Sequence, residues 1–295
     1  MTTTSNATAY HFTIGGIHAT AVSDGQASFP AYPNYAANAE QHEVGEALRR
    51  HGLDPDLYLL NATSLLLQRD GRTVLVDAGA GASLGPGFGH LPERLRDAGV
   101  DPAQIEVVHI THGHLDHVGG LITPSGDLAF PHARLSIHAA DWAYWTDPEL
   151  DLTALPLPQQ FRDAFRDTAH ATLPRLADRV DTFTGPVDLM PGVTAEPAIG
   201  HTPGHSIVAV HDAGQELVVV GDTFHHEAFD LEHPDWRTAF DWDPAAMPAA
   251  RRALLDRVAD TATQVFAYHA PFPGLGTIHH APGSTYRWEP TPWRL

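Results

Sequence analysis

The sequence Thr111-His112-Gly113-His114-Leu115-Asp116-His117-Val118-Gly119-Gly120 places three histidines and one aspartate within six positions. It follows a β-branched run at residues 105–110, which is typical of a buried strand. The cluster therefore lies where a strand ends. Side chains of this kind would repel one another and lose hydration unless a cation lay among them. Because imidazole and carboxylate groups suit zinc and related divalent ions, the stretch predicts a metal site.

The amino-acid composition limits which groups can bind the metal and which partners the protein is expected to have. The 295 residues include no cysteine, so a metal must be held by histidine, carboxylate or backbone oxygen. Lys and Arg number 17 and Asp and Glu number 36, which gives a formal net charge of −19. This charge argues against nucleic acid or an anionic membrane as a partner, because both favour basic surfaces. With no signal-peptide pattern and no long apolar stretch, we expect a cytoplasmic protein.

Strand and helix patterns alternate along the chain and indicate one α/β domain over residues 1–295. We expect hairpins at residues 12–22 and 62–76, and helices at 40–51, 92–98, 152–172 and 245–259. Further strands are expected at residues 105–110, 134–138, 179–183, 193–199, 207–210, 216–220 and 264–268. This order indicates two similar halves of mixed sheet with helices outside.

Three segments fall outside that alternation. Residues 1–9 are small and polar and are expected to form a flexible end. Residues 25–40 carry prolines and aromatics, which we interpret as a loop that covers a pocket or packs as a dimer arm. The last 25 residues contain five prolines and are expected to wrap around the surface.

Metal-type side chains stand at four strand ends, which can converge on one rim of a sheet. One ion could be bound by the first two histidines of the cluster, the other by its aspartate and last histidine. Later strand ends would then complete both sites and supply a bridging carboxylate, as in two-metal hydrolases. The seven candidate ligands are His112, His114, Asp116, His117, His205, Asp222 and His269.

These residues, with the motif Gly200-His201-Thr202-Pro203-Gly204-His205-Ser206, resemble the metallo-β-lactamase-fold hydrolase superfamily. The resemblance implies a four-layer αβ/βα sandwich with two divalent ions, zinc being expected, at the sheet edges. A narrower resemblance to the branch of methyl parathion hydrolase and related lactonases rests on residues 221–226, 230–243 and 270–276. Many acyl-homoserine lactonases of the superfamily carry tyrosine three residues after the bridging aspartate, where this chain has His225.

The function implied by this resemblance is hydrolysis of a small molecule by a metal-bridging hydroxide. The substrate would be an ester, a lactone such as an acyl-homoserine lactone, or a phosphotriester. Asp116 is expected to bind metal and move a proton, and His225 to donate a hydrogen bond to the substrate or to be a core histidine. The alternatives are a persulfide dioxygenase with one iron and, against the acidic charge, a nuclease.

The remaining aromatic and polar residues receive simpler interpretations. Trp145, Phe224 and Phe272 are candidate walls of an apolar pocket. Asp77 is expected to fix a ligand histidine, and His201 to orient the loop that carries the second histidine of its motif. Other histidines are interpreted as structural, including His109, His138 and His211.

Overall fold

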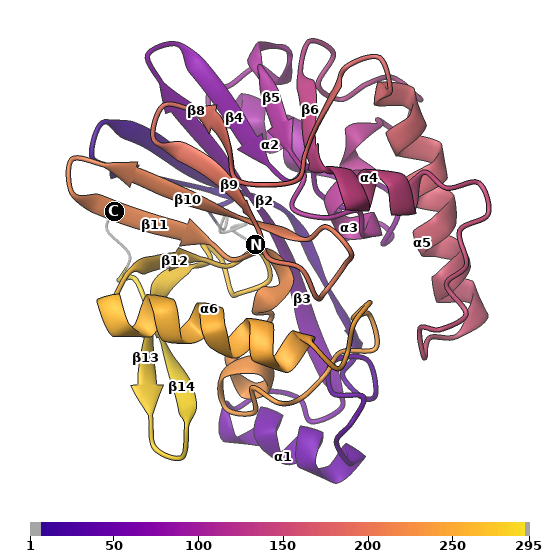
Figure 1. Ribbon diagram of the computed structural model, residues 1–295, viewed down its shortest axis with the longest axis vertical. Helices are drawn as coiled ribbons and strands as arrows, with labels where there is room; N and C mark the ends of the chain where they lie inside the picture. Colours follow the sequence, from indigo (N-terminus) through magenta and orange to yellow (C-terminus); the bar gives the residue numbers. More distant parts are fainter. Residues whose placement is uncertain (1–6, 293–295) are drawn as a thin grey trace, which may run out of the picture.

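Residues 7–292 are described by the computed structural model, in which two seven-stranded sheets face each other (Figure 1). The first sheet follows chain order and contains β1 (Ala9–Ile14), β2 (Ile17–Pro30), β3 (Leu57–Arg69), β4 (Arg72–Val76), β5 (Val107–His109), β6 (Arg134–His138) and β7 (Val180–Phe183). The second sheet contains, from edge to edge, β14 (Thr285–Pro290), β13 (Leu275–Ala281), β12 (Gln264–Phe266), β11 (Gln215–Val219), β10 (Ser206–Asp212), β9 (Val193–Pro197) and β8 (Val187–Met190). Both sheets mix parallel and antiparallel pairs.

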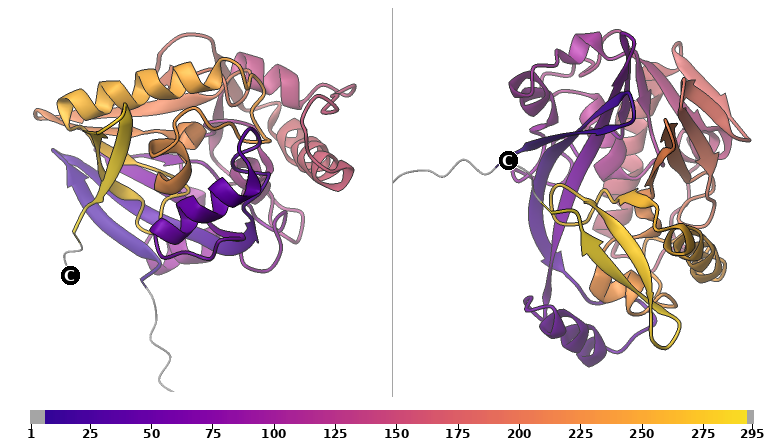
Figure 2. Two further views of the ribbon diagram at one scale, coloured as in Figure 1. Left: turned by 90° about the horizontal axis from the view of Figure 1, so that it is seen from below. Right: turned by 90° about the vertical axis from the view of Figure 1, so that its left-hand side faces the viewer.

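Helices cover the outer faces of both sheets, as the views in Figure 2 show. The α-helices are α1 (Gln41–Arg50), α2 (Leu91–Asp97), α3 (Leu115–Val118), α4 (Ala139–Trp145), α5 (Gln159–Thr172) and α6 (Met247–Thr261). Shorter helical turns are η1 (Pro102–Gln104), η2 (Gly119–Leu121), η3 (Leu173–Leu176), η4 (Gly221–Thr223) and η5 (Glu227–Leu231), the last of which is a π-helix. Helices α2 to α5 pack on the first sheet and α6 packs on the second.

The alternation of side chains along the strands builds these layers. In β11, Leu217 and Val219 face the first sheet, whereas Val218 joins the cluster under α6. This period of two follows from the pleat of a strand. The result is a helix–sheet–sheet–helix order, which confirms the expected four-layer α/β sandwich.

Three segments differ from the sequence-based expectations. Residues 25–30 continue β2, because they pair with β3, and only residues 31–40 remain a loop. Helix α5 begins at Gln159 rather than Leu152, directly after the proline-containing segment 152–158. The C-terminal part forms the β13–β14 hairpin, with Pro282 in its turn, instead of wrapping the surface. Of the end expected to be flexible, residues 1–6 lie outside the described residues, whereas Ala9 already belongs to β1.

Among the helices between residues 7 and 292, none is both long enough and apolar enough to span a membrane.

Candidate metal centre

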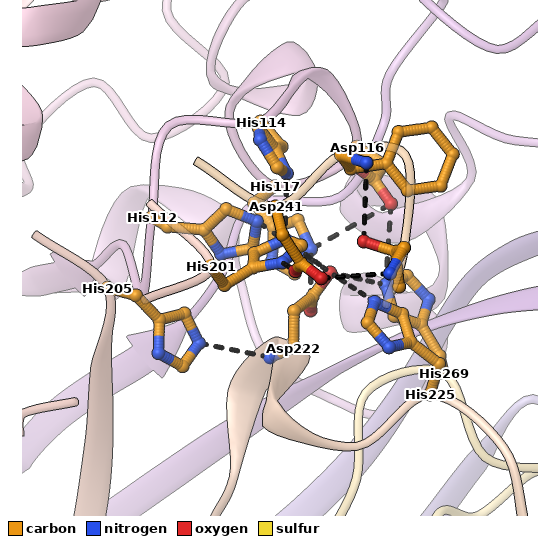
Figure 3. Close-up of polar contacts among 12 residues, drawn as sticks. His112, His114, Asp116, His117, His201, His205, Asp222, His225, Asp241 and His269 are labelled. Carbon is orange, nitrogen blue, oxygen red and sulfur yellow. Dashed lines mark hydrogen bonds and ion pairs between the residues drawn. The ribbon is translucent and has the colours of Figure 1, made fainter. Parts of the chain in front are cut away.

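Histidines and carboxylates from both sheets meet at one edge of the sandwich (Figure 3). The first sheet supplies the loop after β5 and the start of α3. The second sheet supplies the β9–β10 loop, η4 after β11, and the residues that follow β12. Each of these segments begins where a buried strand ends, so the backbone turns away from the sheet and leaves the side chains facing one another.

One group of four buried side chains could hold a metal ion: His112, His114, His201 and Asp222. Nε2 of His201 lies 3.0 Å from Nδ1 of His114 and 3.4 Å from Oδ2 of Asp222. Nε2 of His112 lies 3.7 Å from the same carboxylate oxygen. Three imidazoles and one carboxylate thus converge from both sheets.

A second set of donors lies on the other side of Asp222. Asp116, His117 and His269 form one group that could hold an ion, and Asp222, His225 and His269 form another. Nε2 of His269 is 3.5 Å from Oδ2 of Asp116 and 3.2 Å from Oδ2 of Asp222. Oδ1 of Asp222 is 3.2 Å from Nε2 of His117. Asp222 therefore contacts donors of both sets, as a bridging carboxylate would.

The chemistry of these donors fits a divalent cation. Nε2 of His112, Nε2 of His117 and Oδ1 of Asp222 are buried and make no hydrogen bond of good geometry, although the last two face each other at 3.2 Å. Buried polar atoms normally have a hydrogen-bond partner. Burial and the neighbouring imidazoles lower the pKa of His112 and of His114 well below 6.5, so both retain a lone pair for a metal. Burial opposes the charge of Asp222, but the histidines around it hold its pKa well below the usual range.

Outer partners fix the orientation of three of these imidazoles. Nδ1 of His117 is 3.0 Å from Oδ2 of Asp77, the residue expected to fix a ligand histidine. Nδ1 of His269 hydrogen-bonds the carbonyl oxygen of Asn61 at 2.7 Å. Nδ1 of His201 is 2.9 Å from Oδ1 of Asp241, which the sequence analysis missed. Such contacts set the tautomer and aim the other ring nitrogen at a metal.

The two histidines of the Gly200–Ser206 motif exchange the roles that the sequence analysis gave them. His205 lies outside the donor groups, because the backbone occupies both of its ring nitrogens. Nδ1 is 3.0 Å from the carbonyl oxygen of Ala198, and Nε2 accepts the N–H of Asp222 at 3.0 Å. His205 thus positions the loop of Asp222, while His201 takes the expected place beside His112 and His114. No local sequence signal separates two histidines of one turn.

A cavity adjoins the donor groups, and its empty space amounts to about 640 Å³ when the open solvent at its mouth is included. Both expected catalytic residues, Asp116 and His225, line it at the end that the donor groups form. The rest of the wall is mainly apolar and comes from Phe29, Tyr35, Leu60, Leu84, Leu115, Leu157, Phe161, Phe165 and Phe240, with Asn34. No lysine or arginine occurs among the described residues that form this wall. Residues 25–40, the segment expected to cover a pocket, contribute Phe29, Asn34 and Tyr35 to the wall.

The three aromatics expected as pocket walls lie elsewhere. Trp145 is fully buried in the core under the first sheet, where its ring meets His114 edge-on. Phe224 packs into the cluster beneath α6. Phe272 lies beside a separate cavity that Arg94 also lines. The sequence indicated these three rings as candidates for the pocket wall, but it could not show which way each ring points.

His225 is held by a buried ion pair behind the cavity. Oδ2 of Asp230 accepts the backbone N–H of His225 at 2.7 Å, and Oδ1 of Asp230 pairs with Nη2 of Arg251 at 3.0 Å. Nε2 of His225 is 3.3 Å from Oδ2 of Asp222. Burial lowers the pKa of His225, but the carboxylates of Asp222 and Asp230 outweigh it and raise that pKa to about 10.

Comparison with known proteins agrees with this geometry. The family model described as the metallo-beta-lactamase superfamily matches residues 57–269. A probable metallo-hydrolase of Mycobacterium tuberculosis is 30% identical over 189 residues, which is 55% of this chain and 56% of that protein. The chain thus spans about half the length of the curated relative that it matches.

Two solved structures resemble the chain over nearly its whole length. AidC, a dizinc quorum-quenching lactonase, has a TM-score of 0.88 at 22% identity, covering 97% of this chain and 98% of AidC. The hydrolase AbOPH has a TM-score of 0.86 at 25% identity, covering 98% and 99% respectively. Fold and site define an α/β sandwich with a candidate metal centre at its edge. The chain belongs to the metallo-beta-lactamase superfamily.

Proposed function

We propose that the protein is a metal-dependent hydrolase of small, uncharged esters or lactones that carry an apolar chain, with uncharged phosphotriesters as the related substrate class. The observation that carries this proposal is the mainly apolar cavity whose inner end is formed by His114, Asp116, Asp222, His225 and His269. An apolar chain would occupy the outer part, and its scissile group would face the donor groups.

The charge of the cavity supports an uncharged substrate. The charged side chains at its inner end include the carboxylates of Asp116 and Asp222, and the described wall residues offer no lysine or arginine to pair with an anion. Anionic groups beyond the one that reaches the ions, as in a nucleic-acid strand or a substrate with several carboxylates, would therefore lie unpaired in the apolar part of the cavity, which is costly. This argues against the nuclease alternative. The alternative of an iron-dependent dioxygenase needs a site for one ion only. This structure instead has two groups of donors that share Asp222, which favours two ions.

In this proposal the metal donors and the polar residues at the inner end of the cavity divide the tasks of the reaction. His112, His114, His201 and Asp222 would hold one ion, and Asp116, His117 and His269 the other. Bound there, divalent ions supply an activated water and polarise the scissile group. Asp116 would accept a proton as the nucleophile forms, and His225 would donate a hydrogen bond to the leaving oxygen. The two solved structures, a dizinc lactonase and a hydrolase by description, support hydrolysis.

The test is a substrate panel on the zinc-loaded protein. It contains acyl-homoserine lactones with butanoyl, hexanoyl and decanoyl chains, an aryl ester, paraoxon and a bis-aryl phosphodiester. We expect kcat/KM to rise with acyl length, because longer chains bury more apolar area in the cavity. Chelation should abolish turnover, zinc should restore it, and metal analysis should find two ions per chain. Full activity without metal, or a preference for the phosphodiester, would contradict the proposal.

A further inference from the structure

Helix α4 lies beside both loops that bring histidines to the first donor group, yet it supplies no donor and does not line the cavity. Its N-terminus is capped by His138, whose Nδ1 accepts the N–H of Ala140 at 3.2 Å. The helix follows β6 directly and packs against the core of the first sheet through Trp145. It is therefore a fixed part of the scaffold.

Asp141, on this helix, joins the two histidine loops through a single carboxylate. Oδ2 of Asp141 accepts the backbone N–H of Gly113 at 2.7 Å, and Oδ1 accepts that of Gly204 at 2.8 Å. Gly113 stands between His112 and His114, and Gly204 is three residues after the third histidine of that group. Asp141 is fully buried, so water does not compete for these hydrogen bonds.

Both loops rest so closely on α4 that only glycine fits at the contact points. A Cβ on Gly113 would collide with the ring of Trp145. A Cβ on Gly204 would lie 2.6 Å from the backbone nitrogen of Asp141, closer than real Cβ atoms approach. The glycines thus allow the backbone amides to reach the carboxylate.

The two loops belong to different sheets, so Asp141 acts across the boundary between the halves of the molecule. His114 comes from the first sheet and His201 from the second, and their facing ring nitrogens are 3.0 Å apart. The N–H of Ser206 also bonds the carbonyl oxygen of Thr111 at 2.9 Å across the same boundary. The separation of the histidines therefore depends on how the two loops are held.

We propose that Asp141 is a positioning residue that sets the spacing of His112, His114 and His201 before a metal arrives. The proposal rests on the metal centre of the proposed function. The carboxylate does not contact Asp116, His117 or His269. Its removal should therefore affect one of the two ions and not the other.

The first experiment is a chelator-competition titration of zinc with the variant Asp141→Asn. The amide keeps the shape of the side chain but turns one acceptor into a donor that faces a backbone N–H, so one loop loses its anchor. We expect the affinity for one zinc ion to fall at least 10-fold, with the other ion bound as in the unmodified protein. Unchanged affinity for both ions would overturn the proposal.

Asp24→Asn is the matched control. Asp24 is also fully buried and accepts three backbone N–H groups, those of Ala80, Gly89 and Leu91, at 2.9–3.1 Å. We expect this variant to unfold at a lower denaturant concentration while its zinc affinities stay unchanged. If both variants lost zinc to the same extent, Asp141 would have only a general role in stability and the proposal would be wrong.

If the variant Asp141→Asn does not fold, hydrogen exchange on the unsubstituted, metal-free protein tests the proposal instead. If Asp141 holds the loops in advance, the amides of Gly113 and Gly204 exchange slowly before zinc is added and no faster afterwards. Fast exchange that slows only after zinc binds would show that the metal orders the loops, which overturns the proposal. Neither readout needs a substrate, so a failure of the proposed hydrolysis would be distinguishable from a failure of this inference.

Discussion

His201 and His205 belong to the same turn but have opposite surroundings. Asp241 orients the ring of His201 towards the donor group, whereas the backbone of Ala198 and Asp222 occupies both nitrogens of His205. A metal ligand needs one nitrogen that is free and aimed at the ion. At the residue scale, this difference favours His201 over His205 as the metal ligand that we propose.

The variant His201→Ala tests that assignment. We expect zinc content to fall from two ions to one per chain and turnover to fall at least about 100-fold, because one ion loses a direct ligand. Metal analysis after gel filtration and the lactone assay measure the two effects. His211→Ala, which removes an exposed histidine, is the control and should leave both unchanged. Zinc loss in His205→Ala with retention in His201→Ala would contradict the assignment.

Tyr35 provides a second test at this scale. Its ring packs against Tyr58 in the cavity wall, but its hydroxyl has no hydrogen-bond partner among residues 7–292. By contrast, the hydroxyls of Tyr58 and Tyr268 bond backbone carbonyls. Burial, together with Asp116 and Asp222, raises the pKa of Tyr35 well above 10, so the phenol stays protonated and can donate to a substrate oxygen.

We therefore expect Tyr35→Phe to lower kcat/KM for the preferred lactone or ester by about 10- to 100-fold, the usual range for one lost donor. The ring remains, so zinc content and melting temperature should not change. Tyr286→Phe, whose hydroxyl bonds Asp256 away from the cavity, is the control. An unchanged kcat/KM in Tyr35→Phe would show that the hydroxyl does not contact the substrate.

The sequence could predict the donors that lie close together in the chain but not those chosen by distant contacts. The spacing from His112 to His117 already indicated a metal site, because the chemistry is local. The choice of His201 depends on Asp241, which lies 40 residues further on. The direction of Trp145 depends on its packing under Gly113. Such long-range contacts leave no periodic signal in one sequence.

At the scale of elements, α6 supports the site through Arg251, which is fully buried. Its Nε donates to the carbonyl oxygen of Thr223 at 3.1 Å, next to Asp222 in the chain. Its Nη1 donates to the carbonyl oxygens of Pro234 and Trp236 at 3.1 and 2.6 Å. One side chain thus ties α6 to η4 and to the segment that leads to Asp241.

The variant Arg251→Met should lower the free energy of unfolding by about 3–5 kcal/mol, because the buried carboxylate of Asp230 loses its partner. Chemical denaturation measures this change. Arg257→Met on the same helix is the control. It breaks a partly exposed pair with Glu196 and should cost about 0–1 kcal/mol. Equal losses in the two variants would contradict the role given to Arg251.

Most elements could be predicted from hydrophobic period and glycine or proline boundaries, as for β10, β11 and α6. Two of the errors lie where strand pairing overrides local composition. Residues 25–30 carry a proline yet extend β2, because β3 offers a partner along its full length. The β13–β14 hairpin likewise forms at a sheet edge, where proline can be accommodated.

For the whole molecule, we expect stability to depend on pH through His109, which lies at the boundary between the sheets. Its ring nitrogens lie 3.2 Å from Oγ of Ser136 and 3.1 Å from Oγ of Ser206. Burial lowers the pKa of His109 to about 4, whereas in the unfolded chain it is near 6.5. Between these values the unfolded chain binds a proton that the folded protein does not, so stability falls as the pH drops.

From pH 7 to pH 4 this single histidine should remove up to about 3 kcal/mol of the free energy of unfolding. His109→Asn has no proton to bind, so its stability should decline less over the same interval. The comparison is made by denaturation of the metal-free proteins, which share all other titrating groups. Parallel curves for the two proteins would show that His109 is not the source of the pH dependence.

The exposed turn at residues 184–186, between β7 and β8, connects the two sheets. A break there would leave one polypeptide with His112 and His114 and another with His201 and Asp222. Neither piece would contain a complete set of donors. A zinc ion bound at this site would therefore take ligands from both polypeptides and hold them together. The zinc affinity of the cut protein would then measure how strongly the two polypeptides associate.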